Sequence, residues 1–459
     1  MTILYYFLNN YCTVFKRGVF MKFYACLLSL ISISSFAHIG STQEEVYITS
    51  LKDLDLIKTH SALTIDHISH DGFELYGPTG MKEWLNNAGI SYRENQIIPT
   101  KNKSSIDYPS FAEVEKNLKT FVAMNPSIAK LFSIGKSVDG RDLWVVKISD
   151  NVEIDEVEPE FKYISSMHGD EITGRELTQF LIRDLIAGYG VDQTITDLIN
   201  NTEIFIMPSM NPDGSKRRQR GNARNVDLNR NFPDWTINET NTGANRQVET
   251  IAVMDFQKSR NFSLSANFHG GAVVVNYPWD SSYERHPFDG LLQDLSLKYA
   301  DENPAMRGSR EFNRGITNGA DWYVLRGGMQ DWSYFWYNDL QVTVELSDTK
   351  WPSYRYIPAF YQDNKQSMIN FVEAIHQGAG FIMTNSTDKS GAVKISKVLN
   401  DGSRVSIGKF GFSRSEFYKV LSVGEYVFDI EINGESSSKT YSIVVENKIS
   451  ENGNYLILN

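Results

Sequence analysis

The chain has 459 residues, of which 41% are hydrophobic and 22% are charged, and its formal net charge is -11. This length predicts about two or three domains with a sizeable hydrophobic core. The acidic balance excludes a nucleic-acid-binding protein, because such a protein needs a basic surface.

The first residues have the pattern of an export signal. Met21-Lys22 gives a cationic start, an apolar run extends from Ala25 to Ile33, and Ser35-Phe36-Ala37 offers the small residues at which a signal peptidase cuts. We therefore predict that residues 1–37 are a signal region, with Met21 as an alternative start, and that the protein is exported to the periplasm or secreted. A buried N-terminal helix is the competing interpretation.

Membrane anchoring and disulfide bonding are both disfavoured by the same region. The apolar run is too short to span a bilayer, and no later segment has about 20 uninterrupted apolar residues. Both cysteines, Cys12 and Cys26, fall inside the predicted signal region. The mature chain would therefore have neither a disulfide nor a cysteine-bound metal.

The residues after the signal region predict a small α/β unit over residues 44–100. Val46 to Ile48 has a strand pattern, Met81 to Asn87 has a helix pattern, and Asp71-Gly72 provides a turn between two strands. Pro99 to Tyr108 is polar and has no periodicity, which is typical of a linker.

Residues 108–380 alternate between apolar strands and helices. The helices include Phe111 to Met124, Gly174 to Ala187 and Gln247 to Gln257. The predicted strands are Leu143 to Ile148, Phe161 to Met167, Glu203 to Met207, Leu264 to Phe268 and Gln341 to Leu346. This pattern predicts a mixed, mostly parallel sheet with helices on both faces. Functional sites in such sheets gather at the carboxyl ends of the strands.

Residues 381–459 predict a β-sandwich. Alternating residues mark the strands Ala392 to Ser396, Arg404 to Ile407, Tyr426 to Ile432 and Thr440 to Val445. Asn433-Gly434 begins the connection between the last two and is a typical hairpin start.

Two strands of the central block end in potential metal ligands. His168 and Glu171 follow the strand Phe161 to Met167, and His269 follows Leu264 to Phe268. Two histidines and one glutamate leave a tetrahedral zinc with an open position for water, which is a catalytic arrangement. A single histidine at a strand end is more often a surface or capping residue.

Two further groups of residues could take part in catalysis or substrate binding near such a metal. Arg220 and Arg230 flank Asn229, and arginine offers fork-shaped donors to a carboxylate or an oxyanion. A solvated polar loop is the alternative. Glu345 interrupts an apolar strand, where an ionised side chain is costly unless it is paired or functional. It could act as a general base, or it could be a structural carboxylate paired with an arginine.

Several local strings resemble the zinc metallocarboxypeptidases, and in particular their carboxypeptidase D/E/N-type branch. They are DLNRNFPD, HGG..VVNYPWD, GITNGADWY, GGMQDW and VELS, and they occur in the family's order over roughly residues 108–380. The resemblance implies a hydrolase that removes single residues from the C-termini of peptides or proteins.

The resemblance also implies a role for each matching residue. One Zn²⁺ would be held by His168, Glu171 and His269. Glu345 would take a proton from the attacking water and pass it to the leaving amine, and Arg220 would stabilise the oxyanion.

The remaining matches concern the substrate. Asn229 and Arg230 would hold its terminal carboxylate, and Tyr323 would close over it. Asp280 and Gln330 match positions that face a pocket for lysine or arginine, so the resemblance implies basic C-termini. Asp280 as a turn cap is the competing interpretation.

The flanking blocks carry weaker resemblances. Residues 381–459 resemble a transthyretin-like β-sandwich, and the unit at 44–100 resembles the prosegments of other bacterial carboxypeptidases. The second resemblance departs from the D/E/N pattern and leaves open whether the unit is a cleaved inhibitor or a permanent domain. Two other functions also remain: a carboxypeptidase acting on the peptide stems of the cell wall, and an inactive binding module, against which the intact ligand set argues.

Overall fold

The computed structural model describes residues 43–60, 62–94, 108–385, 388–435, 437–449 and 454–458. The predicted signal region lies outside these residues, as does most of the predicted linker. Among the described residues, no helix is long and apolar enough to cross a membrane. The division of the chain into separate domains stays a prediction.

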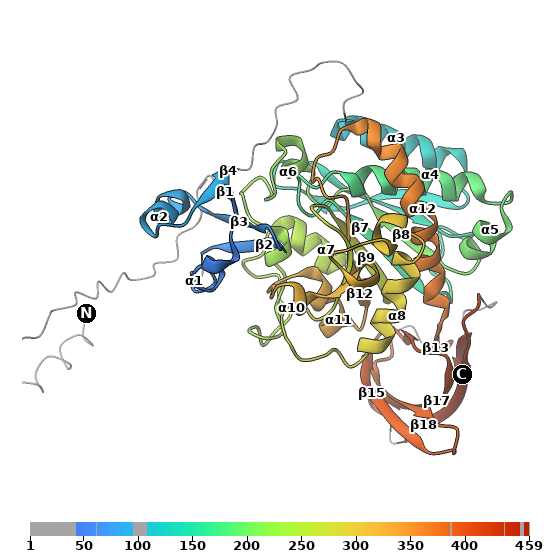
Figure 1. Cartoon of the computed structure of the whole chain (residues 1–459). Helices are drawn as coiled ribbons and strands as arrows, with labels where there is room; N and C mark the ends of the chain where they lie inside the picture. The colour runs from blue at the N-terminus through green and yellow to red at the C-terminus, as the bar shows by residue number, and fades with distance from the viewer. Residues whose placement is uncertain are drawn as a thin grey trace, which may run out of the picture. The chain divides into compact units, whose positions relative to one another are not determined.

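An eight-stranded sheet forms the centre of residues 129–346, and it is mixed as predicted (Figure 1). Its spatial order is β11-β10-β12-β9-β7-β8-β6-β5. The strands are β5 Ala129–Lys136, β6 Asp142–Ile148, β7 Glu160–Ser165, β8 Glu203–Met207, β9 Phe262–His269, β10 Val273–Tyr277, β11 Ile316–Asn318 and β12 Leu340–Leu346. The central strands β12, β9, β7 and β8 run parallel, whereas β10, β6 and β5 pair antiparallel with their inner neighbours.

Helices cover both faces of this sheet because side chains alternate along each strand. On one face, Tyr163 and Ile206 belong to a core that includes residues of α4 (Thr173–Gly188), α8 (Asp289–Ala300) and α12 (Ile357–Glu373). The remaining helices on this side are α3 (Phe111–Met124) and α5 (Gln193–Ile199). On the other face, Ile164 and Phe205 pack with α7 (Val248–Lys258) and α11 (Met329–Tyr337). Buried strands covered on both faces explain the near-continuous apolar runs in the sequence.

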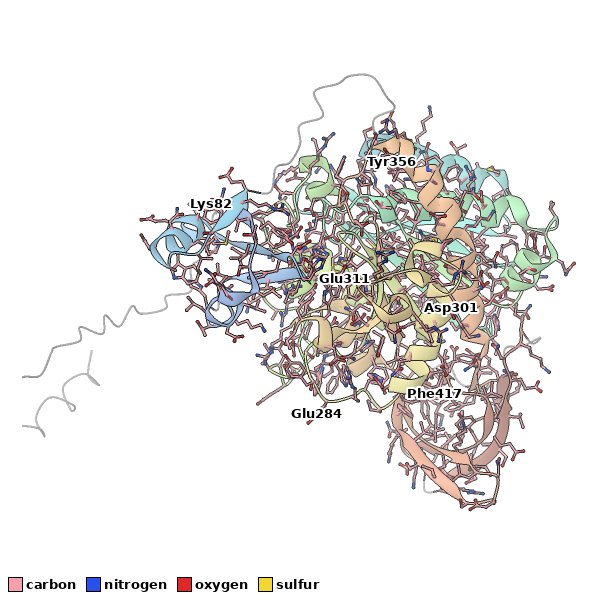
Figure 2. The ribbon with its side chains drawn as sticks, viewed as in Figure 1. Lys82, Glu284, Asp301, Glu311, Tyr356 and Phe417 are labelled. Carbon is pink, nitrogen blue, oxygen red and sulfur yellow. The ribbon has the colours of Figure 1, made fainter. Side chains whose placement is uncertain are left out.

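The N-terminal unit is a four-stranded sheet with two short α-helices, which agrees with the predicted α/β class and adds two strands to the predicted pair. Its order is β2-β3-β1-β4. The elements are β1 Gln43–Ile48, α1 Leu54–Lys58, β2 Thr64–Ser69, β3 Gly72–Pro78, α2 Met81–Asn87 and β4 Tyr92–Glu94. Val46, Phe73 and Leu85 belong to a hydrophobic core of its own. Lys82, labelled in Figure 2, pairs with Glu94 at its surface.

The C-terminal strands form two sheets, which confirms a β-sandwich as the class of this region. They are β13 Gly378–Met383, β14 Gly391–Val398, β15 Arg404–Phe412, β16 Glu416–Val420, β17 Gly424–Ile432, β18 Lys439–Val445 and β19 Tyr455–Leu458. One sheet has the order β16-β13-β19 and the other β15-β14-β17-β18. Phe417 (Figure 2) contacts Phe410 and Phe428 of the opposite sheet and thereby joins the two layers. Strand β13 spans the boundary predicted at residue 380.

Candidate active site

The predicted ligands and base come together because three adjacent parallel strands end at one edge of the sheet. His168 lies three residues beyond the end of β7, and His269 is the last residue of β9. Glu345 of β12 is the register partner of His269. This edge is where parallel sheets place their ligands, so residues almost 180 positions apart in sequence share one site.

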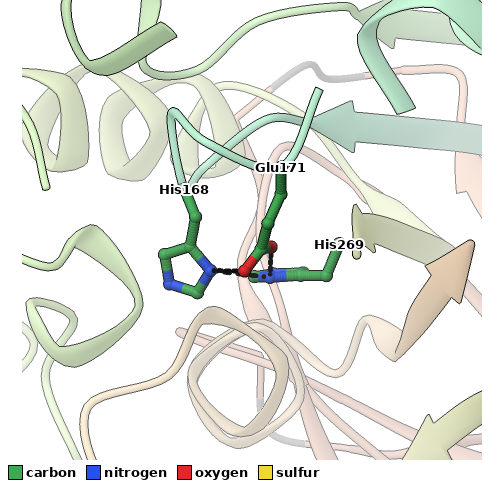
Figure 3. Close-up of side chains that lie close together, drawn as sticks. All are labelled: His168, Glu171 and His269. Atoms are coloured by element: carbon green, nitrogen blue, oxygen red, sulfur yellow. Dashed lines mark hydrogen bonds and ion pairs between the residues drawn. The ribbon is translucent and has the colours of Figure 1, made fainter. Parts of the chain in front are cut away.

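His168, Glu171 and His269 form a compact triad (Figure 3). His168 Nδ1 lies 2.9 Å from Glu171 Oε1, His269 Nδ1 lies 2.8 Å from Glu171 Oε2, and the two Nδ1 atoms are 3.0 Å apart. Ligands bound at about 2.0–2.2 Å around a tetrahedral zinc would be separated by about 3.3 Å. The three side chains are buried, and their facing atoms suit a zinc ion with a small outward adjustment.

Asp227 orients the first of these ligands. Its Oδ1 lies 3.0 Å from His168 Nε2, and its Oδ2 accepts a 2.9 Å hydrogen bond from Arg220 Nε. A proton on Nε2 leaves the Nδ1 lone pair facing the other two ligands, as a metal requires. Burial alone would raise the pKa of Asp227, but Arg220 and His168 hold that pKa well below its ordinary value. The aspartate is therefore a permanent anion behind the histidine.

The residues predicted to hold the substrate line the same cleft. Asn229 and Arg230 lie in the 3₁₀ turn Leu228–Arg230, where the side chain of Asp227 accepts a hydrogen bond from Asn229 N. Asn229 and Tyr323 line a small cavity together with His168, His269 and Glu345. Arg220 is buried beside this cavity, 3.4 Å from Glu171 Oε1.

Glu345 is buried and pairs with no arginine among the residues that the structure describes. Its Oε1 lies 3.6 Å from His67 Nε2, and its Oε2 has no hydrogen-bond partner in the described part of the chain. A buried carboxylate oxygen without a partner is costly, which is typical of a functional group. The geometry therefore does not support the alternative of a structural ion pair with arginine.

Asp280 and Gln330 also meet at the cleft. Asp280 Oδ1 accepts hydrogen bonds of 3.0 Å from both Gln330 Nε2 and Asn276 Nδ2. Burial, followed by the neighbouring carboxylate of Asp331, raises the pKa of Asp280 well above its ordinary value. Asp331 in turn accepts backbone N–H groups of Asp280 and Ser281, and burial raises its pKa to about 6.

This acidic pocket is rich in unused acceptors. The side-chain oxygens of Asn276 and Gln330 are buried and have no partner in the described structure, while the amide nitrogens of both residues donate to Asp280 Oδ1. Gly319 makes room for the carboxylate, since a Cβ at that position would lie 1.8 Å from Asp280 Oδ1. Converging acceptors without donors are suited to a guanidinium or ammonium group, which is donor only.

A segment of the N-terminal unit enters the cleft, which the sequence did not predict. The Asp66 carboxylate lies 2.5 Å from Arg220 Nη1 and accepts a hydrogen bond from the Tyr323 hydroxyl. Sequence reasoning also missed Asp227 and Asn276 as site residues. Both stand inside strings that resemble the family, so their proximity to predicted ligands was the available signal.

Comparisons with known proteins show which proteins the chain is similar to. The family model described as zinc carboxypeptidase matches residues 114–367. The chain is 40% identical over 370 residues to carboxypeptidase M of Mus musculus, covering 75% of this chain and 82% of that protein. It is also 40% identical over 373 residues to carboxypeptidase D of Homo sapiens, covering 74% of this chain but only 26% of that protein.

The solved structures add information on the fold. Carboxypeptidase A from Helicoverpa armigera has a TM-score of 0.57 at 19% identity, covering 72% of this chain and 97% of that one. At this identity the likeness concerns the fold alone, and it confirms the predicted α/β architecture.

Proposed function

Because the chain belongs to the zinc carboxypeptidase family, we propose that it is a zinc-dependent exopeptidase that removes lysine or arginine from the C-termini of peptides or proteins. One observation carries the proposal. A triad suited to zinc and a buried acid surrounded by unused acceptors line a single cleft. The chain spans about a quarter of the length of the carboxypeptidase D it matches, so its activity is inferred from its own site.

The side chains fit distinct tasks in this reaction. Bound zinc would be held by His168, Glu171 and His269 and would polarise the scissile carbonyl and activate water. Glu345 has a free carboxylate oxygen with which to accept the proton of the attacking water and return it to the leaving amine. Arg220 is positioned by Asp227 to stabilise the negative charge of the tetrahedral intermediate.

The substrate would be fixed at two points. Asn229, Arg230 and Tyr323 would grip the terminal carboxylate, so a chain without a free C-terminus could not bind productively. Asp280 and Gln330 would receive the side chain. A basic residue would supply donors to the unpartnered side-chain oxygens of Asn276 and Gln330 and a positive charge to Asp280, whereas an apolar residue would leave the buried acid without an ion-pair partner.

The proposal is tested on blocked dipeptides that end in arginine, lysine, leucine or phenylalanine, with zinc present or removed by a chelator. We expect release of arginine and lysine well above leucine and phenylalanine, and no release after zinc removal. Chelator-resistant cleavage would contradict the zinc assignment, and a preference for phenylalanine would contradict the pocket assignment. Cleavage of cell-wall stem peptides without cleavage of arginine substrates would favour that alternative function.

We also propose that the protein is exported, on the basis of the signal pattern in residues 1–37. A reporter enzyme fused after residue 37 should be recovered outside the cytoplasm. The same reporter lacking residues 21–37 should remain inside, and equal distribution of the two would argue against export.

A further inference from the structure

The connection between β6 and β7 is strongly acidic. Residues 150–160 contain six acids and no lysine or arginine. Glu158 stands two residues before the start of β7, whereas His168 stands three residues beyond the end of that strand. The acidic connection therefore lies at the opposite edge of the sheet from the predicted zinc ligands, and the proposed reaction does not use it.

Three of these acids, Asp150, Glu156 and Glu158, form a compact group, which we call the loop carboxylates. Each offers one carboxylate oxygen, and these oxygens lie within 4.8 Å of one another. Around a calcium ion that binds its ligands at about 2.4 Å, two ligand oxygens are at most about 4.8 Å apart. The spacing of the loop carboxylates therefore suits three ligands of one calcium ion.

The loop carboxylates have very few hydrogen-bond donors. One oxygen of each, namely Asp150 Oδ1, Glu156 Oε2 and Glu158 Oε2, is buried and accepts no hydrogen bond in the described part of the chain. The Asn151 amide donates to the other oxygen of two of them, at 2.9 Å to Glu156 Oε1 and at 3.5 Å to Asp150 Oδ2. Three acceptor oxygens thus converge without a donor, which is the arrangement that a cation satisfies.

Glu158 is the least compensated member of this group. It is only 9% exposed, and its Oε2 has no partner among the described residues. Burial, followed by the charges of Glu156 and Asp150, raises the pKa of Glu158 to about 9. An ionised carboxylate is costly in such surroundings. A divalent cation removes this cost because it supplies both positive charge and coordination.

A neighbouring group of acids shows what compensation by the protein looks like. Asp155, Glu160 and Glu203 also offer oxygens within 4.8 Å of one another. However, Arg260 Nη1 lies 3.2 to 3.5 Å from a carboxylate oxygen of each of them, and Lys147 Nζ lies 2.6 Å from Glu203 Oε1. The nearby basic side chains therefore neutralise this second group and leave the loop carboxylates without an ion-pair partner in the described structure.

We propose that Asp150, Glu156 and Glu158 bind one calcium ion that joins the two ends of the β6–β7 connection. Carboxylate oxygens are the ligands that hard cations such as calcium prefer. The backbone already holds the site in shape, because Asp150 N donates to the Ile199 carbonyl at 3.2 Å and Glu156 N donates to Glu203 Oε1 at 3.1 Å. Calcium sites of extracellular modules have Kd values of about 10⁻⁴–10⁻³ M. We expect an affinity in this range.

The first test measures calcium binding by the full chain with its zinc in place. Protein dialysed against calcium-free buffer is titrated with CaCl₂ in a calorimeter at constant ionic strength, and metal analysis checks that zinc is retained. We expect one calcium ion per chain with a Kd of about 10⁻⁴–10⁻³ M. No binding at about 10 mM CaCl₂ would overturn the proposal. MgCl₂ should bind at least about tenfold more weakly, because Mg²⁺ gives up its water reluctantly, and equal affinities would overturn the choice of calcium.

A charge-neutral substitution then locates the ion. Glu158→Gln keeps the size of the side chain and removes its charge, so the Kd for calcium should rise at least about tenfold. The matched control is Glu153→Gln in the same connection, because the side chain of Glu153 is 70% exposed and pairs with Lys130 at the surface. The control should bind calcium as the wild type does. An unchanged Kd in Glu158→Gln, or an equal loss in both variants, would overturn the assignment of the ligands.

Thermal unfolding separates a calcium ligand from a residue that is only structural. About 10 mM CaCl₂ should raise the ratio of folded to unfolded wild type about 10- to 100-fold, which appears as a higher midpoint, and should affect Glu158→Gln much less. In calcium-free buffer Glu158→Gln should unfold at or above the wild-type midpoint, since glutamine carries no charge to be buried. A lower midpoint there would show that Glu158 stabilises the chain without calcium and would overturn the proposal.

Asp150→Asn provides the same comparison if Glu158→Gln does not fold, and its Kd for calcium should also rise at least about tenfold. An unchanged Kd in Asp150→Asn would overturn the proposal. None of these measurements depends on peptide hydrolysis, so the calcium site and the proposed function are tested separately.

Discussion

Replacing Asp280 by asparagine is the most direct test of substrate selection. The carboxylate is 3% exposed, and the side-chain oxygens of Asn276 and Gln330 beside it are buried and receive no hydrogen bond in the described structure. A guanidinium bound there would form a desolvated ion pair, and removing one partner of such a pair costs about 3–5 kcal/mol. Because asparagine keeps one acceptor oxygen, we expect about 3 kcal/mol, which corresponds to about a 100-fold loss in kcat/KM for C-terminal arginine.

The assay compares kcat/KM for blocked dipeptides ending in arginine and in leucine. The ratio should fall about 100-fold in Asp280→Asn, because a neutral pocket gains nothing from the arginine charge. Asp321→Asn is the matched control, since Asp321 is half exposed and pairs with Arg285, an interaction worth about 0–1 kcal/mol. An arginine-to-leucine ratio that stays within about threefold of the wild type in Asp280→Asn would refute the assignment of this pocket.

Three other outcomes follow from the same geometry. Glu345→Gln should lower kcat by about 10²–10⁴-fold while zinc content by metal analysis stays unchanged, because the residue lies outside the ligand triad; full activity would exclude it as the base. Asp227→Asn should weaken zinc affinity by about 10–100-fold in a chelator titration, since His168 loses its anionic partner; unaltered affinity would show that this contact is dispensable. Because burial and Asp331 raise the pKa of Asp280, its charged form appears only as pH rises through that pKa. KM for C-terminal arginine, which stays charged, should therefore fall with rising pH while KM for leucine does not, and parallel curves would contradict this.

The elements that the sequence predicts well are those with strong local signals. Helix α3 occupies Phe111–Met124 as predicted, because Ser110 and Glu113 form a capping box at its start. The predicted strand Phe161 to Met167 ends early at Ser165, since Ser166 has a left-handed φ of 52° that turns the chain toward His168. A local conformation of this kind has no apolar pattern to reveal it.

The residues of the site also fall into those that local sequence signals predict and those that they do not. The metal triad was predictable because His269 ends one buried strand, His168 and Glu171 lie in the loop just after another, and parallel strands bring their ends together. The polar residues around the triad were less predictable. Asn276 contributes to the acidic pocket because β10 pairs antiparallel with β12, a pairing between segments separated by more than sixty residues. Partners on loops and on neighbouring strands depend on the register of strand pairing, which composition and periodicity do not specify.

The occupation of the cleft by Asp66 and His67 was beyond sequence reasoning for a physical reason. In the sequence of β2, Asp66 and His67 stand between two isoleucines, and a charged pair of this kind in a short strand would be expected to face water. In the structure both are buried, and Arg220, Tyr323 and Glu345 contact them from the side of the cleft. A strand that is regular on its own would have no reason to place His67 at a positive φ. The bulge is therefore better explained by the contacts with the cleft than by the N-terminal unit alone.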